Sequence, residues 1–282
     1  MRKIMDKGYL TPEDYAEPRC VLCDEPYGVT PEVKPVPQGR IIEKMNDYMS
    51  RRDYAGAERH LLYWLEEAKL GHDKGGELMI RGELVGHFRK TANREGAFGS
   101  AAEALRLIDE MNFGDSISAA TTYINIATAY NSFDENEKAV PLFEKAMAIY
   151  EASDNVSPEL LGGLYNNMAL TLVSLGRFDE AYPLYDKALA VMANVPGGSL
   201  EQAITYLNIA DALEAQLGGE QAEGKIGDLL DKAYDLLINT NAPHNGYYAF
   251  VCEKCAPSFS YYGYFLAAGE LNKRAEEIYE RS

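Results

Sequence analysis

The four cysteines of the chain occur as two pairs, each with two residues between its members. Cys20 and Cys23 form the first pair, and Cys252 and Cys255 form the second. A gap of this length lets both thiolates of a turn bind one ion, and two such pairs complete the tetrahedral shell of structural zinc. The sequence therefore predicts one zinc ion held by all four cysteines.

The surroundings of the cysteines refine this prediction and leave alternatives open. Because proline suits the first turn of a helix, Pro257 places Cys255 at a predicted helix N-terminus, where the dipole favours a thiolate. Residues 24–37 could span at most about 46–50 Å when extended. A site shared between two chains of a homo-oligomer would relax that limit. The alternatives are buried thiols paired by chance, or a redox pair, although the strand-to-helix context of thioredoxin-like motifs is missing.

The remaining residue types form no catalytic pattern. The four histidines, His60, His72, His87 and His244, have no metal-ligand spacing. No Gly-rich phosphate loop follows a strand pattern, and neither a serine elbow nor an isolated carboxylate pair stands out. We therefore expect a non-enzymatic protein and keep an enzyme as the last alternative, because catalytic groups can come together only in the fold.

The charge of the chain excludes several classes of partner. Its 282 residues include 44 acidic and 27 basic side chains, for a net charge of -17. This charge repels a phosphate backbone and an anionic membrane surface. No stretch approaches the roughly 20 apolar residues that span a bilayer, and no apolar run follows the basic residues at the start. We expect a cytoplasmic protein that binds neither nucleic acid nor membrane.

Two alternating sequence blocks repeat along the middle of the chain, with offsets of 42 and 41 residues between copies of the first block. Apolar and small residues fall three and four apart within each block, which predicts amphipathic helices. Turns such as residues 176–180, a glycine followed by acidic residues, suit the end of one helix and the start of the next. The pattern predicts antiparallel helix pairs. The first block occupies residues 123–130, 165–172 and 206–213, and the second occupies 143–150, 185–192 and 230–237.

Small residues at matched positions let the paired helices approach closely. They are Ala127, Ala169, Ala210 and Gly263 on the predicted first helices, and Ala146, Ala188 and Ala233 on the second.

These blocks resemble the tetratricopeptide repeat family, and most closely its 42-residue subtype found in kinesin light chains. Residues 164–169, Leu-Tyr-Asn-Asn-Met-Ala, and residues 175–189 carry the resemblance. It implies an all-α solenoid of stacked antiparallel helix pairs, wound as a right-handed superhelix, with about six units over residues 38–282. Residues 1–37 hold six of the twelve prolines and no sustained helical period, so we expect an extended N-terminal arm.

One asparagine recurs at the same place on three predicted first helices: Asn125, Asn167 and Asn208. The resemblance implies that these residues face a concave groove and bond the backbone of a bound peptide, because an amide both donates and accepts. The alternative is that they tie neighbouring helices together or are solvated. The earlier units carry Glu43 and Glu83 at this place, and the last unit carries Tyr261, which we include in the predicted peptide site.

Aromatic residues crowd the stretch from 247 to 265. We expect most of them to seal the core of the last repeat, the alternative being a stacking platform for a ligand or for the arm.

The resemblance implies a protein–protein interaction scaffold or adaptor that binds a peptide or protein segment in its concave groove. Family members that bind a partner's terminal carboxylate carry lysine and arginine around these asparagines, whereas this chain has Thr128, Leu170 and Asp211 there. The resemblance therefore favours a neutral, basic or hydrophobic segment, and the acidic charge would steer basic partners. A second, regulatory hypothesis is that the N-terminal arm lies in the groove, held there by the four cysteines, and controls access of the partner to it. An intracellular signalling-peptide sensor that acts through a partner protein is the alternative, with an enzyme ranked last.

Overall fold

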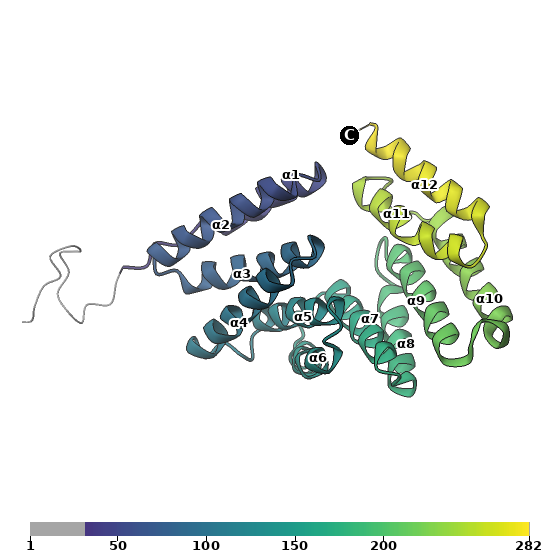
Figure 1. The fold of residues 1–282 in the computed structure, drawn as a ribbon, viewed down its shortest axis with the longest axis horizontal. Helices are drawn as coiled ribbons and strands as arrows, with labels where there is room; N and C mark the ends of the chain where they lie inside the picture. The colour runs from purple at the N-terminus through teal and green to yellow at the C-terminus, as the bar shows by residue number, and fades with distance from the viewer. Residues whose placement is uncertain (1–31, 282) are drawn as a thin grey trace, which may run out of the picture.

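The computed structural model describes residues 32–281, which form twelve α-helices and no strand (Figure 1). Consecutive helices pack as pairs, which confirms the predicted solenoid of stacked helix pairs. The pairs are α1 (Gln38–Ser50) with α2 (Tyr54–Leu70), α3 (Lys74–Lys90) with α4 (Arg94–Glu110), α5 (Ile117–Ser132) with α6 (Asn136–Glu151), α7 (Pro158–Ser174) with α8 (Phe178–Met192), α9 (Ser199–Leu217) with α10 (Gly219–Ile238), and α11 (Gly246–Tyr261) with α12 (Phe265–Tyr279).

In five of the six pairs, the two helices are joined by a tight turn with one residue in the left-handed backbone region. In the α9–α10 pair the turn residue is Gly218, which has φ of 82° and an extended ψ. Gly176 and Gly263 adopt φ of 71° and 84°, which glycine accepts without a Cβ penalty. Such a residue ends the first helix and lets the chain reverse, so it marks the register of each pair. The turn residues are Arg52, Ala92, Asp134, Gly176, Gly218 and Gly263.

The odd-numbered helices form the inner side of the array. Successive odd-numbered helices from α3 to α11 contact one another, whereas the even-numbered helices make their main contacts with odd-numbered neighbours. Curvature brings the helices on the inner side of an array closer together. Figure 1 shows this curvature, which carries the first helix pair round towards the last.

The predicted small residues lie in the core, with one exception. Gly263 was expected on a first helix, and this is wrong because it lies in the turn between α11 and α12. Ala256, which is 1% exposed, takes the buried place seven residues before the turn, as Ala169 does before Gly176. The alanines at the other predicted places are at most 1% exposed: Ala127, Ala146, Ala169, Ala188, Ala210 and Ala233.

The last residues before α1 are fixed on the turn between α2 and α3. The Lys34 N–H donates to the Gly71 carbonyl at 2.8 Å, and the Val36 N–H donates to Asp73 Oδ2 at 2.9 Å. Val36 is buried in the core of the first units. The rest of the predicted arm, including Cys20 and Cys23, lies outside the described residues.

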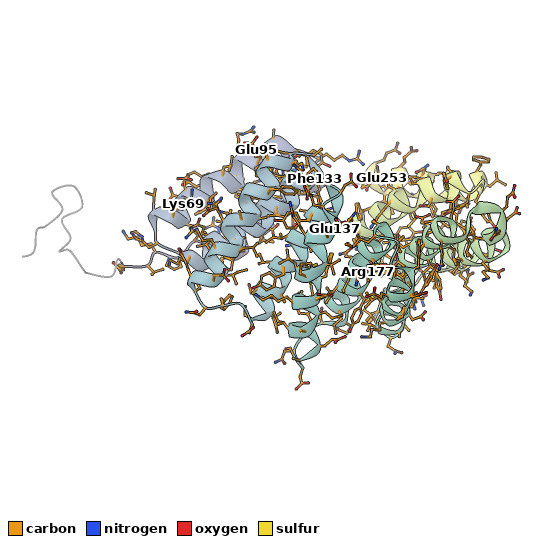
Figure 2. All side chains as sticks on the ribbon, turned by 60° about the horizontal axis from the view of Figure 1, so that its bottom comes forward. Lys69, Glu95, Phe133, Glu137, Arg177 and Glu253 are labelled. Atoms are coloured by element: carbon orange, nitrogen blue, oxygen red, sulfur yellow. The ribbon has the colours of Figure 1, made fainter. Side chains whose placement is uncertain are left out.

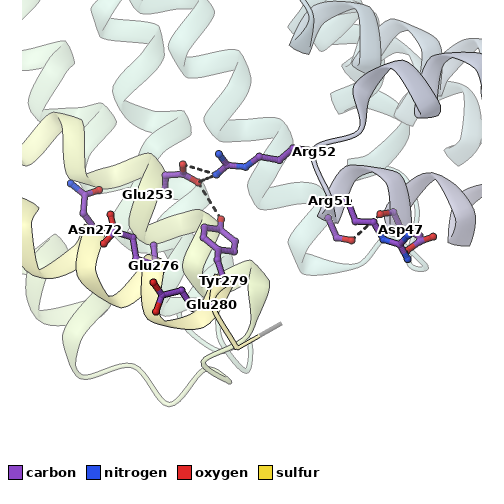
Figure 3. Close-up of a pocket in the computed structure, with 10 residues that line it drawn as sticks. Asp47, Arg51, Arg52, Glu253, Asn272, Glu276, Tyr279 and Glu280 are labelled. Carbon is purple, nitrogen blue, oxygen red and sulfur yellow. Dashed lines mark hydrogen bonds and ion pairs between the residues drawn. The ribbon is translucent and has the colours of Figure 1, made fainter.

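The two ends of the array meet at one ion pair. Arg52 Nη2 lies 2.9 Å from Glu253 Oε1, and the Tyr279 hydroxyl donates to Glu253 Oε2 at 3.1 Å (Figure 3). In Figure 2, Glu253 lies where the last helix pair approaches the first. A cleft of about 810 Å³ opens beside this contact. Because exposed ion pairs contribute only about 0–1 kcal/mol, this contact holds the ends together weakly.

Candidate peptide-binding groove

Each inner helix turns one narrow stripe of residues towards the hollow side. On α7 this stripe has alternating spacings of three and four and consists of residues that are not buried, and its three middle members lie between buried neighbours. The other faces of α7 pack against α8, α6 and α9, so the stripe is the side left for solvent. Its members are Leu160, Gly163, Asn167, Leu170 and Ser174.

The same spacing on neighbouring helices extends this stripe into a surface that we call the inner wall. All of its members are half-buried or exposed except Ile204, which is 6% exposed. The wall adds Ser118, Thr121, Asn125, Thr128 and Ser132 from α5, Glu201, Ile204, Asn208, Asp211 and Ala215 from α9, and Tyr247, Phe250, Lys254, Pro257 and Tyr261 from α11.

The three predicted asparagines form one row across the inner wall, which we call the amide row. Asn208 Nδ2 donates to Asn166 Oδ1 at 3.0 Å and so ties α9 to α7, as one of the two interpretations predicts. The side chains of Asn125 and Asn167 form no hydrogen bond with any residue from 32 to 281. Their amides are therefore free to donate to a ligand and to accept from it.

Tyr261 shares the inner wall but not the amide row. It is the last residue of α11, two residues before Gly263, whereas Asn167 lies nine residues before Gly176. The residue nine before Gly263 is Lys254, which is exposed. At α11 the row therefore continues with the ammonium group of Lys254. At α3 it continues with the carboxylate of Glu83, which lies nine residues before the turn residue Ala92.

Acidic residues and tyrosine hydroxyls cluster where α9 faces the end of α11. The Tyr262 hydroxyl lies 2.8 Å from Asp211 Oδ1 and 3.1 Å from Glu214 Oε2, and Tyr261 donates to Glu214 Oε1 at 3.1 Å. Reduced hydration in the hollow raises the pKa of Asp211, with the bond from Tyr262 acting against it and the Glu214 charge adding to it. A basic ligand side chain would relieve this repulsion between carboxylates.

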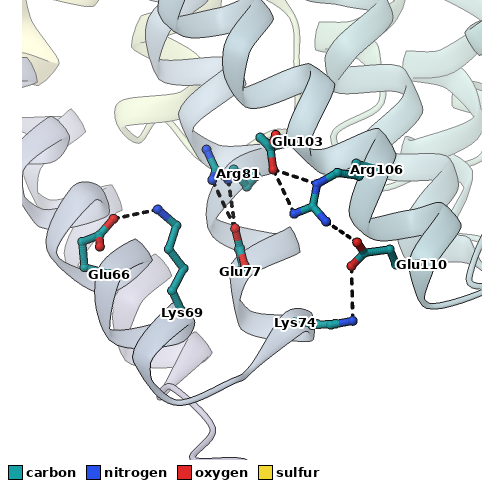
Figure 4. Close-up of polar contacts among 8 residues, drawn as sticks. All are labelled: Glu66, Lys69, Lys74, Glu77, Arg81, Glu103, Arg106 and Glu110. Atoms are coloured by element: carbon teal, nitrogen blue, oxygen red, sulfur yellow. Dashed lines mark hydrogen bonds and ion pairs between the residues drawn. The ribbon is translucent and has the colours of Figure 1, made fainter. Parts of the chain in front are cut away.

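The carboxylates of α4 have a different environment. Figure 4 shows Arg106 between Glu103 and Glu110, with Lys74 bonded to Glu110 as well. These acidic side chains are neutralised by basic neighbours, whereas Asp211 and Glu214 are bonded to neutral hydroxyls. The negative charge of the inner wall on α9 thus has no basic partner at hydrogen-bond distance in the described part of the chain.

A pocket of about 470 Å³ opens on the inner wall between the first turns of α7, α9 and α11, and we call it the edge pocket. Its rim carries the carboxylates of Glu159 and Glu201, and the Tyr247 hydroxyl donates to Glu201. Ser157 caps α7 and Asn245 caps α11, which fixes where these helices begin. Its apolar lining includes Met192, Val195, Pro196, Leu200 and Pro243.

Cys252 and Cys255 lie inside α11 and face the core, away from the inner wall. The prediction of a helix N-terminus at Pro257 is wrong, because Asn245 caps the helix and Pro257 lies within it. The two cysteines are 0% and 2% exposed, and burial raises the pKa of both thiols, that of Cys255 to about 12. This environment favours the thiol over the thiolate.

The four-cysteine zinc site stays a prediction, because Cys20 and Cys23 lie outside the described residues. Within residues 32–281, no three side chains of His, Cys, Asp or Glu converge on a position that could hold a metal ion. A shared site would require the second pair to leave the core of the last two units.

The aromatic stretch divides between the two predicted roles. Tyr248 and Phe259 are 0% exposed and seal the core. Tyr247 and Phe250 are each 49% exposed and stack on the inner wall with ring centroids 6.3 Å apart. These exposed rings correspond to the stacking platform that was the alternative prediction, whereas Lys254 was not predicted, although the spacings of three and four along one helix were a usable signal.

Comparisons with known proteins support the repeat architecture. Family models described as tetratricopeptide repeat match residues 119–153 and 160–223. No curated protein matches the sequence. Within residues 32–281, no helix has both the length and the hydropathy needed to cross a membrane.

Three solved structures have similar folds. Aspartyl phosphate phosphatase F from Bacillus subtilis has a TM-score of 0.54 at 17% identity over 86% of this chain and 59% of its own. BtubC (BKLC) from P. vanneervenii has a TM-score of 0.50 at 18% identity over 86% and 91%. A variant of kinesin light chain TPR-like repeats from Podosopora anserina has 0.50 at 17% over 72% and 95%. At these identities the similarity is one of fold.

Proposed function

We propose that this chain, which is built of tetratricopeptide repeats, is a cytoplasmic scaffold or adaptor that binds an extended peptide segment along its inner wall. The observation that supports this most directly is the amide row, in which the side chains of Asn125 and Asn167 have no partner among the described residues. Amides that are half-buried and unpaired suit the alternating donors and acceptors of a peptide backbone. The exposed rings of Tyr247 and Phe250 add apolar area on the same wall.

The charge of the wall favours some peptides over others. Glu201 and Asp211 on the wall, together with Glu214 beside it, make the α9 side acidic, which attracts basic side chains and repels acidic ones. Attraction between exposed charges is screened by salt, so it steers the partner more than it holds it.

Replacing Asn125 and Asn167 together by alanine should weaken peptide binding while leaving the fold intact. Two to four lost backbone bonds at about 0.5–1.5 kcal/mol each lower the affinity about fivefold or more. Asn208 is kept, because its loss would leave the buried Asn166 without its donor. The measurement is fluorescence anisotropy with a labelled peptide selected on the native chain from a phage library of random dodecapeptides.

A matched control replaces Asn155 and Asn272, which are exposed and belong neither to the inner wall nor to the lining of the edge pocket. Equal affinity of the wall variant, the control variant and the native chain would contradict the proposal that the amide row holds the peptide backbone.

We also propose that residues 1–31 restrict access to the wall. The supporting observation is that Lys34 and Val36 are bonded to the turn before α3, so the described part of the chain begins beside the end of an inner helix. Deleting residues 1–31 should raise peptide affinity, about fourfold if they cover the wall three quarters of the time. The deletion stops before Val36 because this residue is part of the core. Unchanged affinity in the same anisotropy assay would argue against gating.

A further inference from the structure

The edge pocket is a preformed apolar cavity at one end of the inner wall. Its volume of about 470 Å³ is in the range of ligand pockets and is enough for one large side chain. Pro196 and Leu200 contribute apolar surface to it, and the half-exposed ring of Tyr247 forms one side. An apolar ligand group would bury these surfaces without a rearrangement of the helices.

The two glycines near the start of α7 differ in what a side chain at their position would meet. A Cβ on Gly162 would come within 2.6 Å of Met192 Cε, so the Met192 side chain of α8 would have to shift to admit it. A Cβ on Gly163 would meet nothing within 4 Å. Since glycine is a poor helix former and packing does not require it here, the main structural effect of Gly163 is to leave the edge pocket open.

The rim of the edge pocket is acidic. Glu159 and Glu201 stand on it, and none of the residues that line it is basic. Glu159 has no ion-pair partner among residues 32–281, while the Glu201 carboxylate accepts only from the neutral hydroxyl of Tyr247 within the same residues. A lysine or arginine beside an apolar side chain would therefore be complementary to the rim.

The edge pocket is continuous with the amide row. Gly163 lies one turn before Asn167 on α7, and Glu201 lies two turns before Asn208 on the same face of α9. A peptide held by the amides can thus place a side chain in the pocket without leaving the wall.

From this geometry we infer that the edge pocket is the specificity site for a peptide segment that carries a large aliphatic or aromatic residue with a lysine or arginine within three positions of it. The apolar side chain fills the pocket and the basic one pairs with Glu159 and Glu201. This inference rests on the proposed function, and it adds which peptides are chosen.

The test compares Gly163→Leu, which fills the pocket, with Gly224→Leu, a control on the outer helix α10 where a Cβ also meets nothing within 4 Å. Both changes favour the helix, so neither should lower the melting temperature. Random dodecapeptides displayed on phage are selected on the native chain, and the most enriched peptide is labelled and measured by anisotropy. We expect Gly163→Leu to weaken its binding about tenfold or more, as for a hot-spot pocket. Gly224→Leu should stay within about twofold.

A second variant, Glu159→Gln with Glu201→Gln, tests the rim without changing the shape of the pocket. Replacing the basic residue of the peptide by glutamine should weaken binding to the native chain and have a smaller effect on this variant, as a double-mutant cycle. Selected peptides that lack the basic–apolar pair, or that bind Gly163→Leu as tightly as the native chain, would overturn the inference. If those peptides still bind the Asn125→Ala, Asn167→Ala variant more weakly than the native chain, the proposed function stands without the inference about the edge pocket. If they bind this variant as tightly as the native chain, both the inference and the proposed function are contradicted.

Discussion

Phe143→Ala should lower the free energy of unfolding by about 3–5 kcal/mol, the usual loss for a large aromatic side chain in a packed core. Phe143 is 0% exposed in the middle of α6, and its ring belongs to the core that joins the units from α3 to α9. Urea unfolding followed by circular dichroism measures the change as a lower midpoint with an unchanged slope.

The matched control is Phe265→Ala, because Phe265 is 72% exposed at the start of α12. Its effect should stay within about 0.5 kcal/mol. A shift at Phe143 as small as that at Phe265 would mean that α6 is not packed as the structure describes.

The fold of the middle units could be predicted from the sequence because two independent signals agree there. The period of three and four places Ala169 and Ala188 on buried faces, and Gly176 marks the turn between their helices. Both signals are local, so a single sequence is enough to reveal them.

The last unit was harder to predict because its local signals point the wrong way. Pro257 is typical of a first helical turn, yet it lies inside α11, where the cap from Asn245 decides the start of the helix. The predicted register of the α11–α12 pair is therefore seven residues too late. The structure has Ala256 at the close contact where Gly263 was predicted, and Lys254 in the amide row where Tyr261 was predicted.

The edge pocket could not be predicted from the sequence. It depends on three helix starts and two loops that meet only in the folded array, and its lining runs from Glu159 to Tyr247. The recurring asparagines are visible in the sequence, but the sequence does not distinguish the bonded Asn208 from the unpaired Asn125 and Asn167, because that difference depends on Asn166 of the neighbouring unit.

Cys255 of the native chain should react with iodoacetamide at pH 8 about a thousandfold more slowly than in the urea-unfolded chain, because the thiolate is the reactive form and burial removes it. Burial raises the Cys255 pKa to about 12 from an ordinary value of 9.0. Cys252 should also be protected, since burial raises its pKa as well. Timed labelling, quenching, digestion and mass spectrometry measure both rates.

The pH dependence of this labelling tests whether burial protects the thiols, and its response to a chelator tests whether a metal protects them. As the pH rises above 9, the thiolate fraction of the unfolded chain levels off while that of buried Cys255 keeps rising, so the ratio of the two rates should decrease.

Because α11 buries both sulfurs without a metal ligand from the described residues, protection should persist when a chelator is added. Protection that disappears on chelation would instead support zinc binding by the four cysteines, since thiolates held by a metal become reactive when the metal is removed. Rapid labelling with and without chelator would contradict the buried position of the pair in α11.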